Sequence, residues 1–153
     1  MISDTHGLLR PEALDALAGV ELIIHAGDIG SPDILPALAA VAPVHAVRGN
    51  VDTQPWAEAI PETNVVEVQG RLLYVLHDLK QLDLKPGAAG FSAVISGHSH
   101  VPARSTRDGV LYFDPGSAGP RRFHLPVSLG RLWVSTDGIR QKLITLHVRE
   151  ERG

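Results

Sequence analysis

Histidine, carboxylate and amide side chains that can bind a metal ion recur along the first hundred residues. The candidates are Asp4, His6, Asp28, Asn50, His77, His98 and His100. Two pairs, Asp4 with His6 and His98 with His100, are spaced i, i+2, which places both side chains on one face of an extended chain. Because the chain has no cysteine, any metal would be held by nitrogen and oxygen ligands.

These candidates lie where predicted strands end. Apolar runs at 22–26, 43–47, 72–77 and 92–96 predict buried strands, and each runs into a candidate ligand or is followed closely by one. The carboxyl ends of strands in an open α/β sheet border the crevice in which ligands bind, so we expect the side chains to converge there. Each fragment alone is more typical of a turn, but their joint order favours a metal site.

The first pair is unusual because only Met1 and Ile2 precede Asp4, whereas strands usually have five or six residues. We expect the natural chain to begin upstream of Met1. If it does not, Asp4 and His6 are weakly tethered, and the first of two metals would be the more loosely bound.

The remaining pattern predicts a mixed α/β domain. Helical spacing predicts helices over 11–17 and 32–40, and a short turn is expected over 81–89. Further strands are predicted at 65–69, 110–113, 131–136 and 139–148, with a hairpin between 65–69 and 72–77. Strand and helix alternate in the first fifty residues, which is typical of a parallel sheet, and hairpins follow.

Length and composition exclude several classes of protein. With 153 residues, we expect a single domain over 1–153, ending in a solvated tail at 149–153. Lys and Arg number 14 against 17 Asp and Glu, a net charge of −3, so extended nucleic-acid binding is not expected. No apolar run is long enough for a membrane span or a signal peptide, and a cytoplasmic protein is expected.

The ordered motifs resemble the calcineurin-like metallophosphoesterase superfamily, in particular the small single-domain phosphodiesterases of bacteria and archaea. The motifs are Asp4-Thr5-His6, Gly27-Asp28, Gly49-Asn50-Val51-Asp52, His77, Gly97-His98-Ser99-His100 and the segment 114–122. The resemblance implies a four-layer α-β-β-α sandwich of two mixed β-sheets between helices. It also implies a dinuclear metal centre at the strand ends.

By position, the resemblance assigns Asp4, His6 and His100 to a first metal and Asn50, His77 and His98 to a second, with Asp28 shared. It implies hydrolysis by a hydroxide that bridges two divalent ions. Mn²⁺ is the first expectation, and Ni²⁺, Fe²⁺, Co²⁺ or Zn²⁺ would also suit these ligands. The residues expected to take part in catalysis are Asp28, Asn50 and Asp52, the last by orienting a metal-bound histidine.

Three positions depart from the family pattern. Val51 replaces a histidine thought to protonate the leaving group, Asp78 replaces a glycine, and Asp114 replaces an asparagine. The small phosphodiesterases generally lack that histidine too, and its absence matters least for a good leaving group such as a phenol. Arg121 and Arg122 are candidates for binding the substrate phosphate.

Other residues that could do chemistry receive structural assignments. His25 and His45 are expected to be core histidines, and Trp56 and Trp133 are expected to be packing residues rather than platforms on which bases stack. His147 is expected on the surface of a strand, and Ser117 in a turn. His124 is left open between a substrate contact and a solvated turn.

The expected function is a metal-dependent phosphodiesterase acting on a small phosphodiester. A phosphomonoesterase of the same fold is one alternative. The other is a non-catalytic scaffold similar to a eukaryotic retromer subunit of this fold. Apolar strand edges make a homo-oligomer a further expectation.

Overall fold

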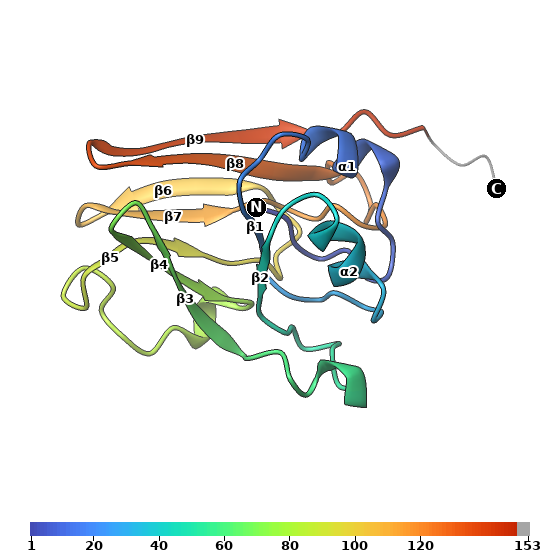
Figure 1. Cartoon of the computed structure of the whole chain (residues 1–153), viewed down its shortest axis with the longest axis horizontal. Helices are drawn as coiled ribbons and strands as arrows, with labels where there is room; N and C mark the ends of the chain where they lie inside the picture. The colour runs from blue at the N-terminus through green and yellow to red at the C-terminus, as the bar shows by residue number, and fades with distance from the viewer. Residues whose placement is uncertain (150–153) are drawn as a thin grey trace.

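A computed structural model describes residues 1–149 of the chain, and its first sheet is built around the N-terminus (Figure 1). Strands β1 (Ile23–His25) and β2 (Val44–Ala46) pair in parallel. On the free side of β1, the Ile2 N–H donates to the Ile24 carbonyl at 2.9 Å. Met1 and Gly130 exchange both backbone hydrogen bonds, at 2.8 and 2.9 Å, the pattern of an antiparallel pair. The first residues therefore link β1 to β8 (Ser128–Ser135), which pairs antiparallel with β9 (Gly138–Thr145).

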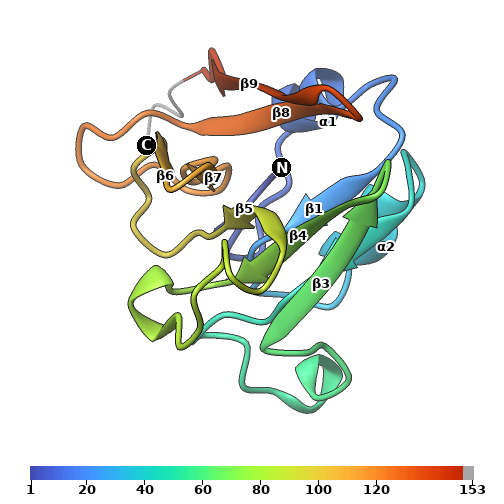
Figure 2. The same cartoon turned by 90° about the vertical axis from the view of Figure 1, so that its left-hand side faces the viewer.

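The second sheet has five strands in the order β3-β4-β5-β7-β6 (Figure 2). Their bounds are Thr63–Val68 for β3, Arg71–Leu76 for β4, Phe91–Ile95 for β5, Ala103–Arg107 for β6 and Val110–Asp114 for β7. The central pairs β4-β5 and β5-β7 are parallel, whereas the outer pairs are antiparallel hairpins. Gln69 and Gly70 turn the β3-β4 hairpin with positive φ angles of 51° and 76°.

Three apolar clusters define the layers. Helices α1 (Pro11–Ala16) and α2 (Ile34–Ala39) pack on one face of the first sheet, where Ile23 points. Ile24, the next residue of β1, enters the cluster between the two sheets, because side chains alternate along a strand. The outer face of the second sheet is covered by the segment that contains the 3₁₀ turn η2 (Leu79–Gln81). A second 3₁₀ turn, η1 (Pro55–Ala57), lies between β2 and β3.

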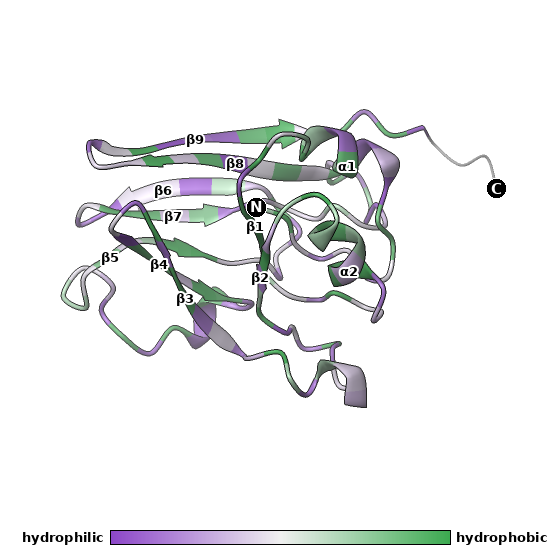
Figure 3. Cartoon of the chain, in the orientation of Figure 1, coloured by the Kyte–Doolittle hydropathy of each residue, from purple (hydrophilic) through white to green (hydrophobic). Residues whose placement is uncertain are grey.

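The predicted α/β class with two mixed sheets is confirmed, and the predicted strands are present with bounds shifted by a few residues. Strand β6 was not predicted, because all five of its residues are exposed and it lacks the apolar pattern of a buried strand. In Figure 3 it is mostly white and purple, with one pale green stretch. Within 1–149 no helix has the length and apolarity to cross a membrane. The predicted tail, apart from the exposed Arg149, lies outside the described residues.

Two predictions of buried side chains were wrong. His45 in β2 is exposed, because β2 is a sheet-edge strand covered on one face only. Trp133 in β8 is 43% exposed, with the Arg140 guanidinium 5.7 Å from its ring centroid. Trp56 is half-buried against the helix-side cluster, as predicted.

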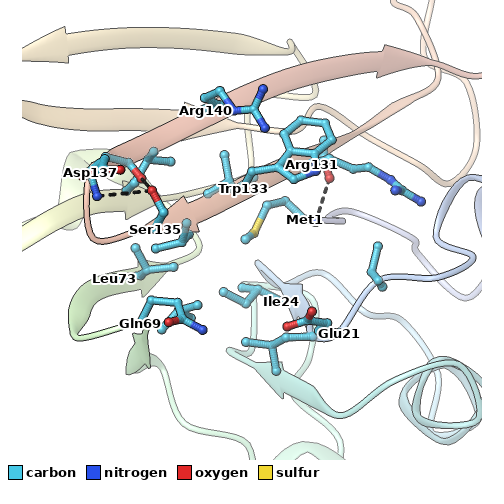
Figure 4. A pocket seen from close by; sticks show the side chains of 18 of the residues that line it. Met1, Glu21, Ile24, Gln69, Leu73, Arg131, Trp133, Ser135, Asp137 and Arg140 are labelled. Atoms are coloured by element: carbon cyan, nitrogen blue, oxygen red, sulfur yellow. Dashed lines mark hydrogen bonds between the residues drawn. The ribbon is translucent and has the colours of Figure 1, made fainter.

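Trp133 lies on a groove of about 710 Å³ between β1 and β8 (Figure 4). Met1 and Ile24 line its floor, and Arg131 and Arg140 its rim. None of the seven predicted metal ligands borders this groove, so it is separate from the predicted site.

Candidate metal centre

The predicted ligands follow the ends of β1, β2, β4 and β5 or the short pairing segment at Ile2, as expected. Five of them have φ in the left-handed region: Asp4 at 54°, His6 at 47°, Asp28 at 54°, His98 at 72° and His100 at 61°. This conformation is uncommon for residues other than glycine and persists only where the surrounding structure imposes it. Here it turns the chain sharply after each strand and gathers the side chains at one end of the sheets.

The first group consists of Asp4, His6 and His100, whose ligand atoms all lie within 4.8 Å of one another. The Asp4 Oδ1 atom is 3.3 Å from His100 Nε2 and 3.8 Å from His6 Nε2. The two Nε2 atoms are 3.4 Å apart. Two imidazole nitrogens and a carboxylate oxygen thus face one point, as the ligands of a divalent ion do.

The two oxygens of Asp4 have different surroundings. Oδ2 accepts hydrogen bonds from the Ser3 hydroxyl at 2.6 Å and the His98 N–H at 3.1 Å. Oδ1 is fully buried and has no hydrogen-bond partner among the described residues. A buried carboxylate oxygen without a partner is costly, so its orientation toward the histidines fits a cation ligand.

The second group consists of Asp28, His77 and His98, with ligand atoms again within 4.8 Å of one another. Asn50 joins it, since its Oδ1 atom lies 3.2 Å from His98 Nδ1. His77 Nδ1 lies 2.7 Å from the Ala26 carbonyl, to which it donates. In the neutral ring Nε2 of His77 is then the unprotonated nitrogen; it is buried, has no hydrogen-bond partner among the described residues and faces the carboxylates.

Asp28 connects the two groups. Its Oδ2 atom is 3.2 Å from His77 Nε2 in the second group and 3.6 Å from His6 Nε2 in the first. Its Oδ1 atom accepts the Val51 N–H at 3.1 Å, which fixes the carboxylate plane. The position agrees with the predicted role of a shared ligand.

The electrostatics keep both carboxylates ionised. Burial acts to raise the pKa of Asp4, but contacts with His6 and Ser3 outweigh it and hold the pKa below its usual value. Burial of Asp28 is likewise outweighed, chiefly by His77, and its pKa is also lowered. Burial lowers the pKa of His77, but its contacts with Asp28 and with a backbone carbonyl raise it above the usual value.

Two glycines permit the close approach of these loops. A Cβ at Gly49 would collide with the Asp28 backbone nitrogen and carboxylate. A Cβ at Gly97 would collide with the Ser3 hydroxyl and lie 2.7 Å from Asp4 Oδ2. Any side chain at these two positions would therefore push the ligand loops apart.

Asp52 does not orient a histidine, contrary to prediction. Its Oδ2 atom accepts the N–H groups of Gly49 at 2.8 Å and Ile29 at 3.0 Å, and Oδ1 accepts that of Gly30 at 3.0 Å. All three donors are backbone groups of the loops that carry Asp28 and Asn50. Asp52 therefore holds these two loops together and has no contact that would make it catalytic.

His25 has the structural role predicted for it. It is fully buried, its Nδ1 accepts the Gly27 N–H at 3.1 Å, and its Nε2 lies 3.0 Å from the Thr5 hydroxyl. Burial lowers its pKa to about 4. His25 is thus neutral and supports the loops on either side of the site. Ser117 is also structural, since its hydroxyl donates to the Asp4 carbonyl at 2.9 Å.

The basic segment after residue 120 reaches the edge of the first group. Burial lowers the pKa of His100, and the nearby Arg122 charge lowers it further. Arg121, Arg122 and His124 are exposed, and His124 lies in a turn, as one of its two interpretations expected. His147 is exposed just after β9 rather than within it.

Ser3 and Ser99 were missed. Ser3 holds the Asp4 carboxylate, and the Ser99 hydroxyl donates to Asp114 at 2.8 Å beneath the His98 to His100 turn. Their position next to predicted ligands is the only sequence signal that could have indicated them.

The donor set fits two divalent ions. Nitrogen and oxygen atoms form two groups connected by Asp28, and within residues 1–149 the buried side-chain atoms without hydrogen-bond partners are Asp4 Oδ1, His77 Nε2 and His100 Nδ1. Three orphaned polar atoms in one place would destabilise the fold unless a cation compensates two of them directly.

Comparison with known proteins places this geometry in a family. The calcineurin-like phosphoesterase superfamily domain matches residues 1–137. A probable metallophosphoesterase of Methanothermobacter thermautotrophicus is 38% identical over 129 residues, which cover 76% of this chain and 74% of that protein. The phosphodiesterase YfcE of Escherichia coli is 28% identical over 160 residues, covering 85% and 84%.

Two solved structures share the fold. An archaeal phosphodiesterase superposes with a TM-score of 0.76 at 23% identity, over 94% of this chain and 97% of that one. Vps29 of Entamoeba histolytica in complex with Zn²⁺ superposes with a TM-score of 0.72 at 19% identity, over 94% and 96%. The match over most of the chain shows that this protein belongs to the calcineurin-like phosphoesterase superfamily.

Proposed function

We propose that the protein is a metal-dependent phosphodiesterase that hydrolyses a small phosphodiester in the cytoplasm. The observation that supports the proposal is the pair of ligand groups connected by Asp28. In the first group the Oδ1 atom of Asp4, which has no hydrogen-bond partner among the described residues, faces histidine nitrogens. The name of the Escherichia coli relative supports a diester as substrate.

Asp4, His6 and His100 would hold one divalent ion, and Asn50, His77 and His98 the other, with Asp28 between them. Divalent ions held there would supply Lewis acidity, making a water a better nucleophile and offsetting charge on the phosphoryl oxygens. We propose Mn²⁺ as the first candidate. Ni²⁺, Fe²⁺, Co²⁺ and Zn²⁺ suit the same donors.

Residues around the site determine where the substrate can enter and which esters suit it. The His98 side chain is 47% exposed, whereas those of Asp4, Asp28 and His77 are buried, so the site is open to substrate beside His98. The Arg122 guanidinium, whose charge acts on His100, would attract the anionic ester. Val51 has no proton to donate beside Asn50, which favours esters whose alcohol is a good leaving group.

Hydrolysis of bis(p-nitrophenyl) phosphate tests the proposal. Protein whose metal has been removed with a chelator should be inactive, and its activity should return on addition of Mn²⁺. Inductively coupled plasma mass spectrometry should then find two metal ions bound per chain. Asp28→Asn preserves volume and tolerates the positive φ, and should reduce kcat/KM by at least about 100-fold. Asp108→Asn, on an exposed turn between β6 and β7, is the matched control and should leave the rate unchanged.

Activity in excess chelator, or full activity of Asp28→Asn, would contradict the proposal. Faster hydrolysis of p-nitrophenyl phosphate than of the diester would favour the phosphomonoesterase alternative. Protein that binds no metal and hydrolyses neither ester would favour the scaffold. Light scattering would test the predicted homo-oligomer.

A further inference from the structure

Exposed apolar side chains concentrate around the metal centre. Among the described residues, seven large apolar side chains are clearly exposed: Leu8, Val41, Val51, Val65, Val101, Phe123 and Trp133. Val51 directly follows the predicted ligand Asn50, and Val101 directly follows His100. Their Cα atoms are therefore about 3.8 Å from the Cα atom of a ligand. The exposed fractions are 44% for Val51 and 46% for Val101.

Hydrogen bonds fix these residues to the site. The Val51 N–H donates to Oδ1 of the shared ligand Asp28 at 3.1 Å. The Val101 N–H donates to the Ser99 hydroxyl at 3.0 Å, within the turn between the two histidine ligands. Leu8, which is 38% exposed, donates its N–H to the Thr5 carbonyl at 2.9 Å, between Asp4 and His6. These apolar side chains thus stand on the loops that carry the ligands.

Phe123 completes the arrangement. It follows Arg122, whose charge acts on His100, and it is 91% exposed. Its φ of 52° is a strained value for an aromatic residue. The segment leading to it is anchored at the site, since Ala118 N–H donates to the Ser3 carbonyl at 3.0 Å. Because its side chain is so exposed, Phe123 buries little apolar surface to offset the cost of its backbone conformation.

Scattered apolar side chains are normal on any protein surface, so their distribution is what matters. Three of the seven, Leu8, Val51 and Val101, are within two residues of a candidate ligand, Phe123 follows Arg122, and the other three lie elsewhere. Val41 follows α2, Val65 is in the edge strand β3, and Trp133 borders the groove at β8. An apolar patch concentrated at one polar site is typical of a binding surface.

We propose that Leu8, Val51, Val101 and Phe123 form an apolar collar that binds the organic groups of the substrate and selects diesters with apolar or aromatic esters. This inference rests on the proposed phosphodiesterase function. The ions and Arg122 would bind the anionic phosphoryl group, while the collar binds what is attached to it. The preference for an aromatic alcohol also agrees with Val51, which offers no proton to a poor leaving group.

Two substrates that share one leaving group isolate this effect. Methyl p-nitrophenyl phosphate and phenyl p-nitrophenyl phosphate both release p-nitrophenol, so they differ only in the ester group that stays on phosphorus. We expect kcat/KM of the Mn²⁺-loaded protein to be about tenfold higher for the phenyl ester, in keeping with burial of one ring face. In Phe123→Ser and in Val51→Ser/Val101→Ser the ratio should fall towards one, with the bound metal unchanged.

Val41→Ser/Val65→Ser is the matched control, because it removes the same two side chains from exposed positions away from the site and should keep the ratio. An unchanged ratio in the collar variants, or an equal fall in the control, would overturn the proposal. The proposal would also be overturned if the collar variants changed the molar mass measured by light scattering but left the phenyl-to-methyl ratio of kcat/KM unchanged. The collar would then be an interface between two copies of this chain.

Binding measurements separate this proposal from the proposed function. Calorimetric titration of the metal-loaded protein with diphenyl and dimethyl phosphate should show tighter binding of the diphenyl ester, lost in the collar variants. If no diester is hydrolysed but this difference remains, the phosphodiesterase proposal fails and the collar stands. Equal binding of the two esters would overturn the collar.

Discussion

Replacing Asp114 with asparagine should stabilise the protein at neutral and alkaline pH. Asp114 ends β7 and is 9% exposed. Its Oδ1 atom accepts the Gly116 N–H at 2.9 Å, and Oδ2 accepts the Ser99 hydroxyl at 2.8 Å. An asparagine can keep both contacts, because its Nδ2 can donate to Ser99 Oγ, which in turn can donate to the Val101 carbonyl at 3.2 Å.

The magnitude follows from the buried charge. Burial raises the pKa of Asp114 from 3.8 to about 6, the negative charge of Asp4 adds to this, and the two hydrogen bonds only partly oppose it. A shift of about two pKa units corresponds to about 3 kcal/mol. The folded state binds this proton more tightly than the unfolded state, so the free energy of unfolding falls as pH rises from about 4 to about 6 and stays low above that.

Urea unfolding followed by tryptophan fluorescence, in chelator and between pH 4 and 8, measures the effect. The free energy of unfolding of Asp114→Asn should exceed that of the parent protein by up to about 3 kcal/mol at pH 8 and should differ little from it at pH 4. Bound metal would neutralise Asp4, so the gain should shrink when Mn²⁺ is added. Asp108→Asn, which lies in an exposed turn, serves as control and should show no such pH dependence.

A gain that is the same at pH 4 and pH 8 would refute the reasoning, because it would not come from the carboxylate charge. Destabilisation at pH 8 would refute it too, since it would show that the ionised carboxylate is better accommodated than its amide.

Three further outcomes are expected. Because burial lowers the pKa of His25 to about 4, His25 should reduce the free energy of unfolding by about 3 kcal/mol as pH falls from about 6.5 to about 4, in the opposite sense to Asp114. His25→Asn should remove this contribution, so in urea unfolding the variant should lose less stability than the parent on acidification; an identical pH dependence would contradict it. Asp52→Asn places an amide NH₂ group against backbone N–H donors, so it should lower the free energy of unfolding by about 1–3 kcal/mol and weaken Mn²⁺ binding measured by calorimetry. Unchanged metal affinity would show that Asp52 does not shape the ligand loops. In Gly30→Ala the new Cβ would collide with the Gly7 backbone, whereas Gly109 has a similar positive φ and open space around it. Gly109→Ala should therefore lower the free energy of unfolding by about 1–2 kcal/mol, and Gly30→Ala by more. Equal melting temperatures of the two variants would refute the argument from close backbone approach.

Much of the site could be predicted because metal ligands are recognisable by type and by position at strand ends. Apolar runs such as 22–26 report local periodicity, and the residues after them fall at one end of the sheets. The core position of His25 followed from these patterns, whereas the shared position of Asp28 was implied by the family resemblance; Asp28 lies between the two groups and His25 is buried. Metal binding at the seven positions stays a prediction.

Errors arose where a side chain's environment depends on distant segments. His45 and Trp133 lie in apolar strands, yet both are exposed, because β2 is an edge strand and β8 borders the groove. Asp52 was expected beside a histidine, but the folded loops present backbone N–H groups to it instead. Edge strand β6 has no apolar signal and exists because β7 offers it hydrogen bonds.

By itself the sequence determined which side chains could bind metal, the absence of thiolate ligands, and the strands that end beside them, because these depend on residue type and local spacing. Only the tertiary structure decided that Asp4 presents Oδ1 and buries Oδ2 against Ser3, and that Asp28 lies between the two groups. It also decided that Val51 and Phe123 remain exposed around the site. These features depend on contacts between residues that are close in space and far apart in the chain, which no local pattern contains.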